Sequence, residues 1–178
     1  MIKGCGNNAG KQSSDHKDVQ ASDAVKNDSA SVFSDRSTWL LGYFKPDKLS
    51  EQPYASWYVT GYEDYQIDSD AVNSLLDVSK DKVSIKIIMG TWCPDSRREV
   101  PRMMRLLDIW KLPMTQVTFI GVDKDKKAAI DGYGSLKIEK VPTFIIYKNN
   151  IEAGRIIERP ATSLEQEMVN ILTITRHE

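Results

Sequence analysis

The feature that most constrains the fold of this chain is a change of residue pattern at Gly90. Residues 83–89 read VSIKIIM, a β-branched run that is typical of a buried strand. Residues 95–110 instead carry their apolar side chains at helical spacing. Between the two lies the stretch WCPDS at residues 92–96, which therefore places a cysteine where a strand ends and a helix begins.

The chain beyond this junction alternates between strand and helix patterns. Apolar runs predict three more strands and the spacing between them predicts a short helix: strands at 116–122, 143–147 and 151–157, and a helix over 124–132. Asn149-Asn150 predicts a two-residue hairpin turn, and a last helix follows Pro160 with Thr162 or Ser163 as its cap. This order predicts an α/β fold, with a mixed central sheet covered by helices on both faces.

The first part of the chain has a different composition. Residues 6–36 are rich in Ser, Asp, Asn, Lys and Ala, so they bury too little apolar surface to offset the conformational entropy of folding. We therefore expect residues 1–37 to be a disordered tether. Gly4-Cys5 followed by a polar linker resembles the end of a bacterial lipoprotein signal, which implies a lipid anchor on Cys5. The alternative is an ordinary free cysteine in a tail, and then a cytoplasmic protein.

Residues 38–178 are expected to form one folded domain, and its first part, residues 38–67, is rich in aromatic residues. The rings are too numerous for a linker and predict a structured extension that packs on the domain: Tyr54, Trp57, Tyr58, Tyr62 and Tyr65. An aromatic surface for binding peptides is the alternative. A helix is expected after this extension, over SDAVNSLLDVSK, with Asp68 or Ser69 as its cap.

Composition excludes several kinds of site. Lys plus Arg number 24 against 25 for Asp plus Glu, a net charge of −1, so no strong field favours nucleic acid as a partner. No apolar run is long enough to span a membrane. The two histidines, His16 and His177, lie near the chain ends, so we expect neither a Cys–His pair, nor a metal site, nor any cofactor.

The motifs around the cysteine resemble the thioredoxin family. The resemblance is carried by Trp92-Cys93-Pro94-Asp95-Ser96, by Pro101 and by Val141-Pro142-Thr143. Within that family, residues 83–175 are similar to the envelope thioredoxin-like proteins of bacteria, which include the TlpA-type reductases. The resemblance implies a cis bond before Pro142 and a kink in the helix at Pro101. It also implies that substrates contact Trp92, Pro94, Val141, Pro142 and Thr143.

The residues at the helix start argue for a reactive thiol independently of the family. Cys93 at the first turn faces unpaired backbone N–H groups and the positive end of the helix dipole, and both favour a thiolate, the nucleophilic form. Pro94 suits the first helical position because it has no N–H. The Ser96 hydroxyl is expected to donate to the sulfur. Cys93 and Ser96 are therefore the candidate catalytic residues.

Two departures from the family pattern limit this chemistry. The second cysteine of thioredoxins is replaced by Ser96, and the acid six residues before the first cysteine is replaced by Ile87. A disulfide between Cys93 and Cys5 is disfavoured, because it must order a long polar segment. The sequence thus predicts a monothiol oxidoreductase or isomerase that acts on protein thiols or disulfides and needs an external thiol. Two alternatives remain open: a binding module for extended protein segments, and a carrier of a shared iron–sulfur cluster.

Overall fold

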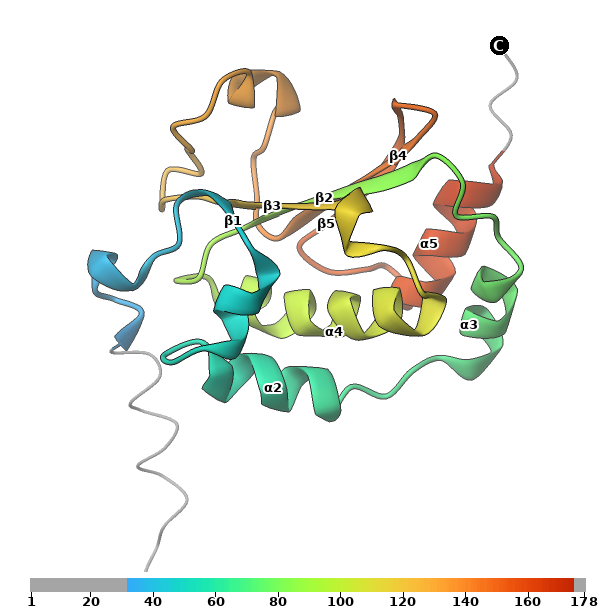
Figure 1. Ribbon diagram of the computed structural model, residues 1–178, viewed down its shortest axis with the longest axis horizontal. Coiled ribbons are helices and arrows are strands. Elements are labelled where there is room, and N and C mark those ends of the chain that lie inside the picture. The colour runs from blue at the N-terminus through green and yellow to red at the C-terminus, as the bar shows by residue number, and fades with distance from the viewer. Residues whose placement is uncertain (1–31, 175–178) are drawn as a thin grey trace, which may run out of the picture.

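The computed structural model describes residues 32–174, and its centre is one five-stranded sheet (Figure 1). The strands lie in the order β1-β3-β2-β4-β5. Strands β2 and β3 are parallel, and the other neighbouring pairs are antiparallel. The sheet is therefore mixed, as expected from the sequence. The strands are β1 (Gly42–Phe44), β2 (Val83–Met89), β3 (Val117–Gly121), β4 (Thr143–Lys148) and β5 (Ile151–Ile157).

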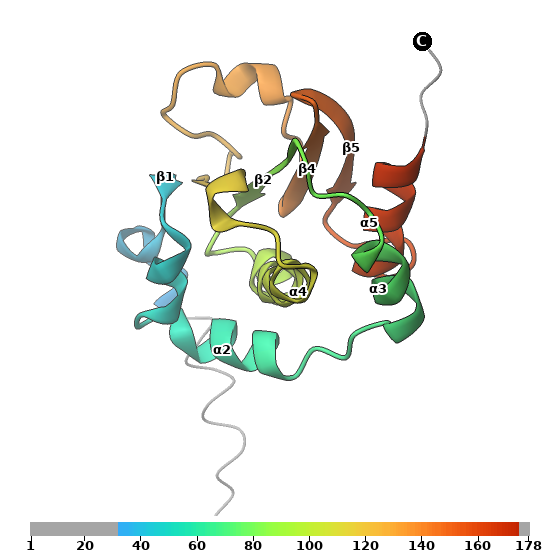
Figure 2. The same ribbon diagram turned by 45° about the vertical axis from the view of Figure 1, so that its right-hand side comes forward.

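The sheet packs against a layer of α-helices. The α-helices of the described residues are α2 (Ala55–Glu63), α3 (Ser69–Leu76), α4 (Pro94–Trp110) and α5 (Leu164–Thr173). Short 3-10 helices are η1 (Arg36–Thr38), η2 (Pro46–Ser50), η3 (Met114–Gln116) and η4 (Tyr133–Leu136). All four α-helices lie on one face of the sheet, with α4 between α2 and the strands (Figures 1 and 2). Pro101 lies inside α4, and Asp68 and Ser163 cap α3 and α5 through their side chains, as predicted.

The two faces of the sheet have separate apolar clusters because strand side chains alternate. In β2, Ile85 and Ile87 join the large cluster beneath the helices, whereas Ile88 joins a smaller cluster on the opposite face. The smaller cluster also contains Cys93 and Val141. The cysteine of the motif therefore lies at the edge of the core, on the face that the α-helices leave open.

The helix predicted over residues 124–132 does not form. A loop replaces it: Lys126 has a positive φ of 57°, and the Asp123 carboxylate accepts the Lys127 N–H at 2.9 Å. Ala128 and Ile130 reach the smaller cluster from this loop, and η4 follows (Figure 2). The sheet is covered on both faces, as expected, but this face is covered by a loop with one short helix.

The aromatic extension packs on the domain, as predicted. Its rings lie against the large apolar cluster or within it: Tyr54, Trp57, Tyr58, Tyr62 and Tyr65. Packing starts before residue 38, because Phe33 is 3% exposed and its ring lies 5.9 Å from that of Tyr54. The extension also adds β1 to the edge of β3, which the sequence analysis did not predict.

The remaining expectations for the ends of the chain lie outside the described residues. These are the tether up to residue 31 and the lipid anchor on Cys5. Within residues 32–174, no helix has the length and apolar character needed to cross a membrane.

Candidate functional site

Cys93 occupies the N-cap of α4, at the carboxyl end of β2. Its backbone is extended, with φ −87° and ψ 122°, and Pro94 takes the first helical position. The side chain is a free thiol and is 8% exposed. Cys93 precedes the first turn of a 17-residue helix, so it lies at the positive end of the helix dipole, although its side chain accepts no capping hydrogen bond. The arrangement predicted from the sequence is therefore present.

The loop before β4 lies directly beside the thiol. The Val141–Pro142 peptide bond is cis, as expected, and the Cys93 S–H donates to the Val141 carbonyl oxygen at 3.3 Å. The Pro142 carbonyl in turn accepts the Glu158 N–H at 2.7 Å, which fixes the loop to the residue after β5. The structure thus brings Cys93, Val141 and Pro142 together from segments almost 50 residues apart in the sequence.

Ser96 is fully buried beneath the junction. Its hydroxyl accepts the Gly90 N–H at 3.2 Å, and the Gly90 carbonyl accepts the Cys93 N–H at 2.9 Å. Among the described residues, no hydrogen bond joins Ser96 to the Cys93 sulfur. In this structure the serine therefore closes the turn that presents the cysteine, and the expected donation to sulfur stays a prediction.

Trp92 covers the same turn from outside. Its indole N–H donates to the Val122 carbonyl at 2.8 Å, and a Cβ on Gly90 would lie 2.5 Å from the indole ring. Gly90 is therefore required for Trp92 to fold over the turn. Thr143, the last of the predicted substrate-contact residues, is buried, and its hydroxyl donates to the Lys140 carbonyl at 2.7 Å.

The extension contacts the site at several points that the sequence analysis missed. The Thr91 hydroxyl accepts the Leu40 N–H and donates to the Thr38 carbonyl, both at 3.3 Å. The Trp39 ring lies 6.3 Å from the Trp92 ring, centroid to centroid. Thr91 is an inconspicuous residue with no spacing signal, so only the register of the folded extension reveals its role.

Arg97 is the arginine of α4 closest in sequence to the thiol. Its guanidinium carbon lies 4.8 Å from the Phe33 ring centre. Burial lowers the pKa of Arg97 from its ordinary value, while attraction to the Cys93 thiolate acts in the opposite direction.

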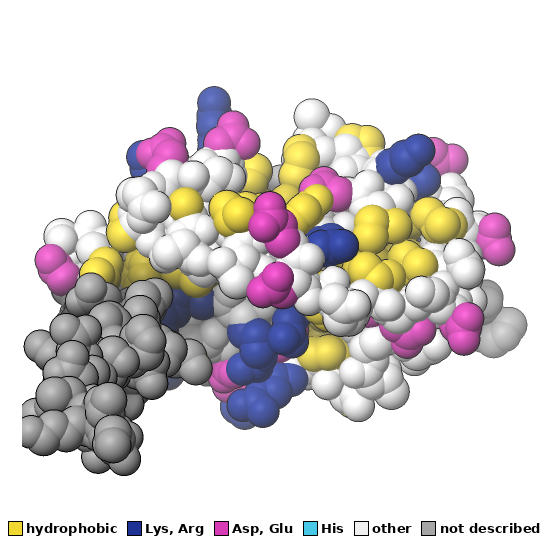
Figure 3. Space-filling view, turned by 90° about the horizontal axis from the view of Figure 1, so that it is seen from below, with side chains coloured by type: hydrophobic (Ala, Val, Ile, Leu, Met, Phe, Trp, Pro, Cys, Tyr) yellow, Lys and Arg dark blue, Asp and Glu magenta, His cyan; other side chains and the backbone are white. Residues whose placement is uncertain are grey.

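Charges of both signs are mixed around the rim. Asp95 pairs with Arg98 at 2.6 Å and with Arg159 at 3.5 Å, and Arg98 also reaches the buried Glu99 at 2.6 Å. The space-filling view of the helix face shows Lys and Arg side chains close to acidic ones, with apolar side chains between them (Figure 3). This face offers no strong field of one sign to a charged partner.

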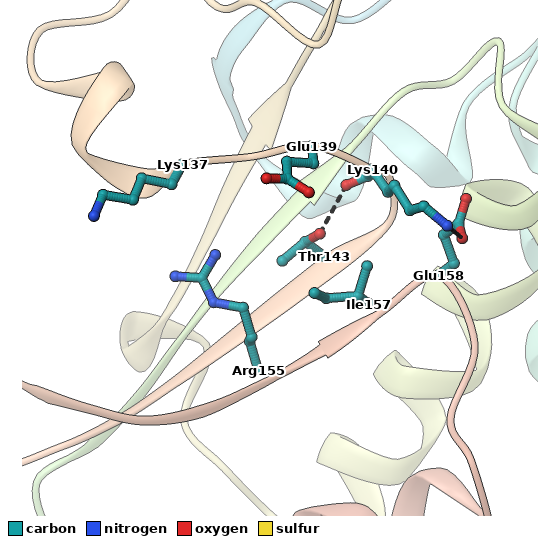
Figure 4. A pocket seen from close by; sticks show the side chains of 7 residues that line it. All are labelled: Lys137, Glu139, Lys140, Thr143, Arg155, Ile157 and Glu158. Carbon is teal, nitrogen blue, oxygen red and sulfur yellow. Dashed lines mark hydrogen bonds and ion pairs between the residues drawn. The ribbon is translucent and has the colours of Figure 1, made fainter.

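A hollow of about 530 Å³ lies beside the cis-proline loop. Its walls are the loop before β4 and the end of β5: Lys137, Glu139, Lys140, Thr143, Arg155, Ile157 and Glu158. Arg155 extends from β5 toward the loop, while Lys140 pairs with Glu158 at 2.7 Å (Figure 4). The hollow presents cations, acids and one exposed apolar side chain next to predicted substrate contacts. Residues 32–174 hold no group of His, Cys, Asp and Glu suited to a metal ion.

The fold and the thiol site together define a thioredoxin-type domain, and comparison with known families agrees. The family model described as thioredoxin matches residues 50–172, well over half of the chain. The chain therefore belongs to the thioredoxin family. Comparison with curated proteins gives no match.

Solved structures give distant likenesses. A Pseudomonas aeruginosa protein of unknown function is 14% identical, with a TM-score of 0.48, over 66% of this chain and 81% of that chain. Thioredoxin O2 from Arabidopsis thaliana, in the oxidised state, is 19% identical, with a TM-score of 0.39, over 61% of this chain and 92% of that chain. The family assignment rests on the family model and not on these two structures.

Proposed function

We propose that this protein is a monothiol thiol–disulfide oxidoreductase or isomerase whose nucleophile is Cys93. The observation that carries the proposal is the position of the sulfur, which lies at the N-cap of α4 and 3.3 Å from the carbonyl before the cis proline. A cysteine at a helix N-terminus is favoured as a thiolate, and the thiolate is the form that attacks disulfides.

The proposed reaction begins with one exchange. The Cys93 thiolate attacks one sulfur of a substrate disulfide, so a mixed disulfide forms while the substrate bond breaks and its other sulfur leaves as a thiolate, which takes up a proton. In isomerisation, another thiolate of the substrate attacks the substrate sulfur of the mixed disulfide, so that a rearranged disulfide forms and Cys93 leaves as a thiolate. In reduction, an external thiolate attacks the Cys93 sulfur and the substrate leaves as a thiol; a second external thiolate then attacks the first, so that the two external thiols form a disulfide and Cys93 is released.

The substrate is proposed to be a protein segment in extended conformation. The loop of Val141 and Pro142, together with Trp92 and Pro94, would contact the segment on either side of the sulfur, and Thr143 lines the neighbouring hollow. The mixed charges of that hollow favour a polar segment over a purely apolar one.

The proposed location is the bacterial cell envelope, with the domain facing the periplasm and held by a lipid on Cys5. The support is the sequence around Cys5, which resembles a lipoprotein signal, and the similarity to TlpA-type proteins. The chain has only two cysteines, so lipidation of Cys5 would leave Cys93 as the single thiol. A resolving thiol would then have to come from another molecule.

The test uses the full chain with Cys5→Ser, incubated with glutathione disulfide and analysed by intact mass. The expected product is a single glutathione adduct that an added dithiol removes. The Cys5→Ser/Cys93→Ser control is expected to stay unmodified. Absence of any adduct from the Cys5→Ser protein would contradict the proposal.

A second candidate function is a binding module that holds extended protein segments at the surface around Cys93 and the cis-proline loop, without turnover. The observation in its favour is the low exposure of Cys93, 8%, with its S–H already donating to the Val141 carbonyl. This candidate predicts no adduct in the glutathione assay. In a separate titration with an unfolded protein, it predicts tight binding that is equal in the Cys93→Ser variant.

A further inference from the structure

One short segment of the extension contacts the residues on both sides of Cys93. The Trp39 indole N–H donates to the Phe33 carbonyl at 3.1 Å, which ties the two aromatic residues into one unit. Trp39 packs on Trp92, just before the cysteine, at 6.3 Å. Phe33 packs on the guanidinium of Arg97 at 4.8 Å. The nucleophile thus lies between two residues that the same unit holds.

Arg97 lies one helical turn after the cysteine. It is four residues after Cys93, and its N–H donates to the Cys93 carbonyl at 3.1 Å. Burial lowers the pKa of its guanidinium, and the smaller effect of attraction to the Cys93 thiolate acts against it. The Phe33 ring is buried, and it restricts the positions that the guanidinium can take. A cation over an aromatic ring is stabilised by the negative face of that ring.

We infer that Arg97, held by Phe33, is the charge partner of the Cys93 thiolate, which makes the docked extension a working part of the thiol site. Phe33 acts through Arg97 and is a positioning residue. The inference rests on the proposed function, because a charge partner matters only for a thiol that reacts as a thiolate. It assigns a role to residues that precede the family match, which begins at residue 50.

The other charged groups around the thiol have partners of their own. On α4, Asp95 pairs with Arg98 and Arg159. On the two loops beside the sulfur, Lys140 pairs with Glu158, and Asp123 accepts the Lys127 N–H. In the loop after β3 and in the extension, Lys124 and Arg36 lie 5.5 and 6.0 Å from the Trp39 ring centre. These contacts direct the neighbouring charges toward one another or toward Trp39.

Arg105 provides a matched comparison on the same helix. Its guanidinium lies 5.9 Å from the ring of Tyr62, another residue of the extension, and donates to the Tyr62 and Glu63 carbonyls. It therefore shares the helix and the aromatic contact of Arg97 but lies about three turns from the cysteine. A purely structural effect of arginine–ring contacts would appear at both positions, whereas an effect on the thiolate is expected at Arg97 alone.

The experiment measures the rate of iodoacetamide alkylation of Cys93 against pH in the full chain with Cys5→Ser. The pH midpoint reports the charge of the sulfur, and the plateau rate at high pH reports its accessibility. Arg97→Met is expected to raise that midpoint by about 1 pH unit, because an opposite charge nearby favours the ionised form.

Two further variants keep the test decisive if Arg97→Met folds poorly. Arg97→Lys retains the charge and is expected to restore part of the shift. Phe33→Leu keeps the arginine but removes the ring, and it is expected to raise the midpoint in the same direction. Arg105→Met should leave the midpoint at the parent value. A parent-like midpoint in Arg97→Met, or an equal shift in Arg105→Met, would overturn the inference.

The glutathione adduct separates this inference from the proposed function. If the midpoint depends on Arg97 but no mixed disulfide forms, the role of Arg97 is supported and the proposed exchange activity is contradicted. If mixed disulfides form with the parent and Arg97→Met has the parent midpoint, the exchange activity is supported and the role of Arg97 is contradicted.

Discussion

The Trp39 ring packs against the Trp92 ring at a centroid distance of 6.3 Å, with the planes inclined by 53°. Trp92 precedes the cysteine of the thioredoxin motif, whereas Trp39 precedes the part of the chain that matches the family, residues 50–172. The contact therefore joins the family domain to a segment that precedes the family match. Ser96 distinguishes the motif from a dithiol motif, and the extension packs beside it.

The attachment of the extension to the sheet depends on Gly121. A Cβ at this position would lie 2.0 Å from the Leu40 carbonyl oxygen, so Gly121→Ala cannot keep β1 and β3 at their present spacing. We expect the free energy of unfolding to fall by about 1–3 kcal/mol, as measured by urea unfolding. The matched control is Gly134→Ala, because a Cβ there meets nothing within 4 Å. Equal midpoints for Gly121→Ala and the control would show that the extension does not dock on β3 in this way.

Ser96→Cys tests whether a cysteine at position 96 can form a disulfide with Cys93. The position is three residues after Cys93 in the same first turn, within the reach of a disulfide. In the Cys5→Ser background, we expect mild oxidation to remove both thiols within one molecule, as measured by thiol titration and non-reducing mass spectrometry. The new side chain loses the hydrogen bond from the Gly90 N–H, so a modest loss of stability is expected as well.

Ser84→Cys is the matched control for this change. Ser84 lies on β2, where it pairs with Tyr147, away from the helix start. The control protein is expected to keep two free thiols or to form dimers. Retention of two thiols by the Ser96→Cys variant under the same oxidation would mean that Cys93 cannot turn toward the helix.

Asp68 joins the start of α3 to the start of α5. Its carboxylate accepts the Ala71 N–H at 3.2 Å and the Ser163 hydroxyl at 2.9 Å. These hydrogen bonds, first that of Ala71 and then that of Ser163, lower the pKa of Asp68 below its ordinary value of 3.8. Asp68→Ala is expected to lower Tm by about 2–4 °C at neutral pH, since it removes a helix cap.

The pH dependence of this change has a definite sign. A lowered pKa in the folded state means that the stabilisation is present above the unfolded pKa of Asp68 and is lost as pH falls through the folded value. The Tm difference between the parent and Asp68→Ala should therefore be full at pH 7 and shrink below about pH 4. Asp70→Ala, which removes a neighbouring acid but leaves the cap, is the control. A difference that persists unchanged at pH 2–3 would rule out the ionised cap as its source.

The sequence predicted the parts of the fold where a local pattern decides the structure. The β-branched runs of β2 to β5, the apolar stripe of α4 and the Asn149-Asn150 turn are signals of this kind, and both asparagines have positive φ. Such features need only a few adjacent residues, so no tertiary information was necessary to predict them. The cis bond before Pro142 was instead implied by the resemblance to the thioredoxin family.

The predicted helix over 124–132 failed because tertiary contacts outweighed propensity. The Asp123 carboxylate accepts the Lys127 N–H and so closes a turn over residues 124–127. Ala128 and Ile130 then lie against the smaller apolar cluster from a loop, not from one face of a helix. Phe33 was missed for the opposite reason: a single aromatic residue in a polar stretch gives no periodic signal. Its burial depends on Tyr54 and Arg97, which only the folded chain brings together.

The last prediction concerns the partly buried Tyr65 and its partner, the buried Glu165. The Tyr65 hydroxyl donates to Glu165 Oε2 at 3.0 Å, and within residues 32–174 the buried Oε1 atom of Glu165 has no hydrogen-bond partner. Tyr65→Phe would leave the carboxyl without its donor, so we expect a loss of about 1–3 kcal/mol in urea unfolding. Tyr43→Phe is the control, because Tyr43 is 64% exposed. A double-mutant cycle with Glu165→Met should show less than additive loss, since both partners are then removed.

The same pair predicts how the stability of the fold changes at alkaline pH. Burial, and then the Glu165 charge, raise the pKa of Tyr65 above its ordinary value of 10.0. A raised folded pKa means that this stabilisation is complete below the unfolded pKa and is lost as pH rises through the folded value. The gap between the parent and Tyr65→Phe should therefore be constant from pH 7 to 9 and narrow above about pH 10. A gap that vanishes already at pH 8 would show that the Tyr65 hydroxyl is not the group responsible.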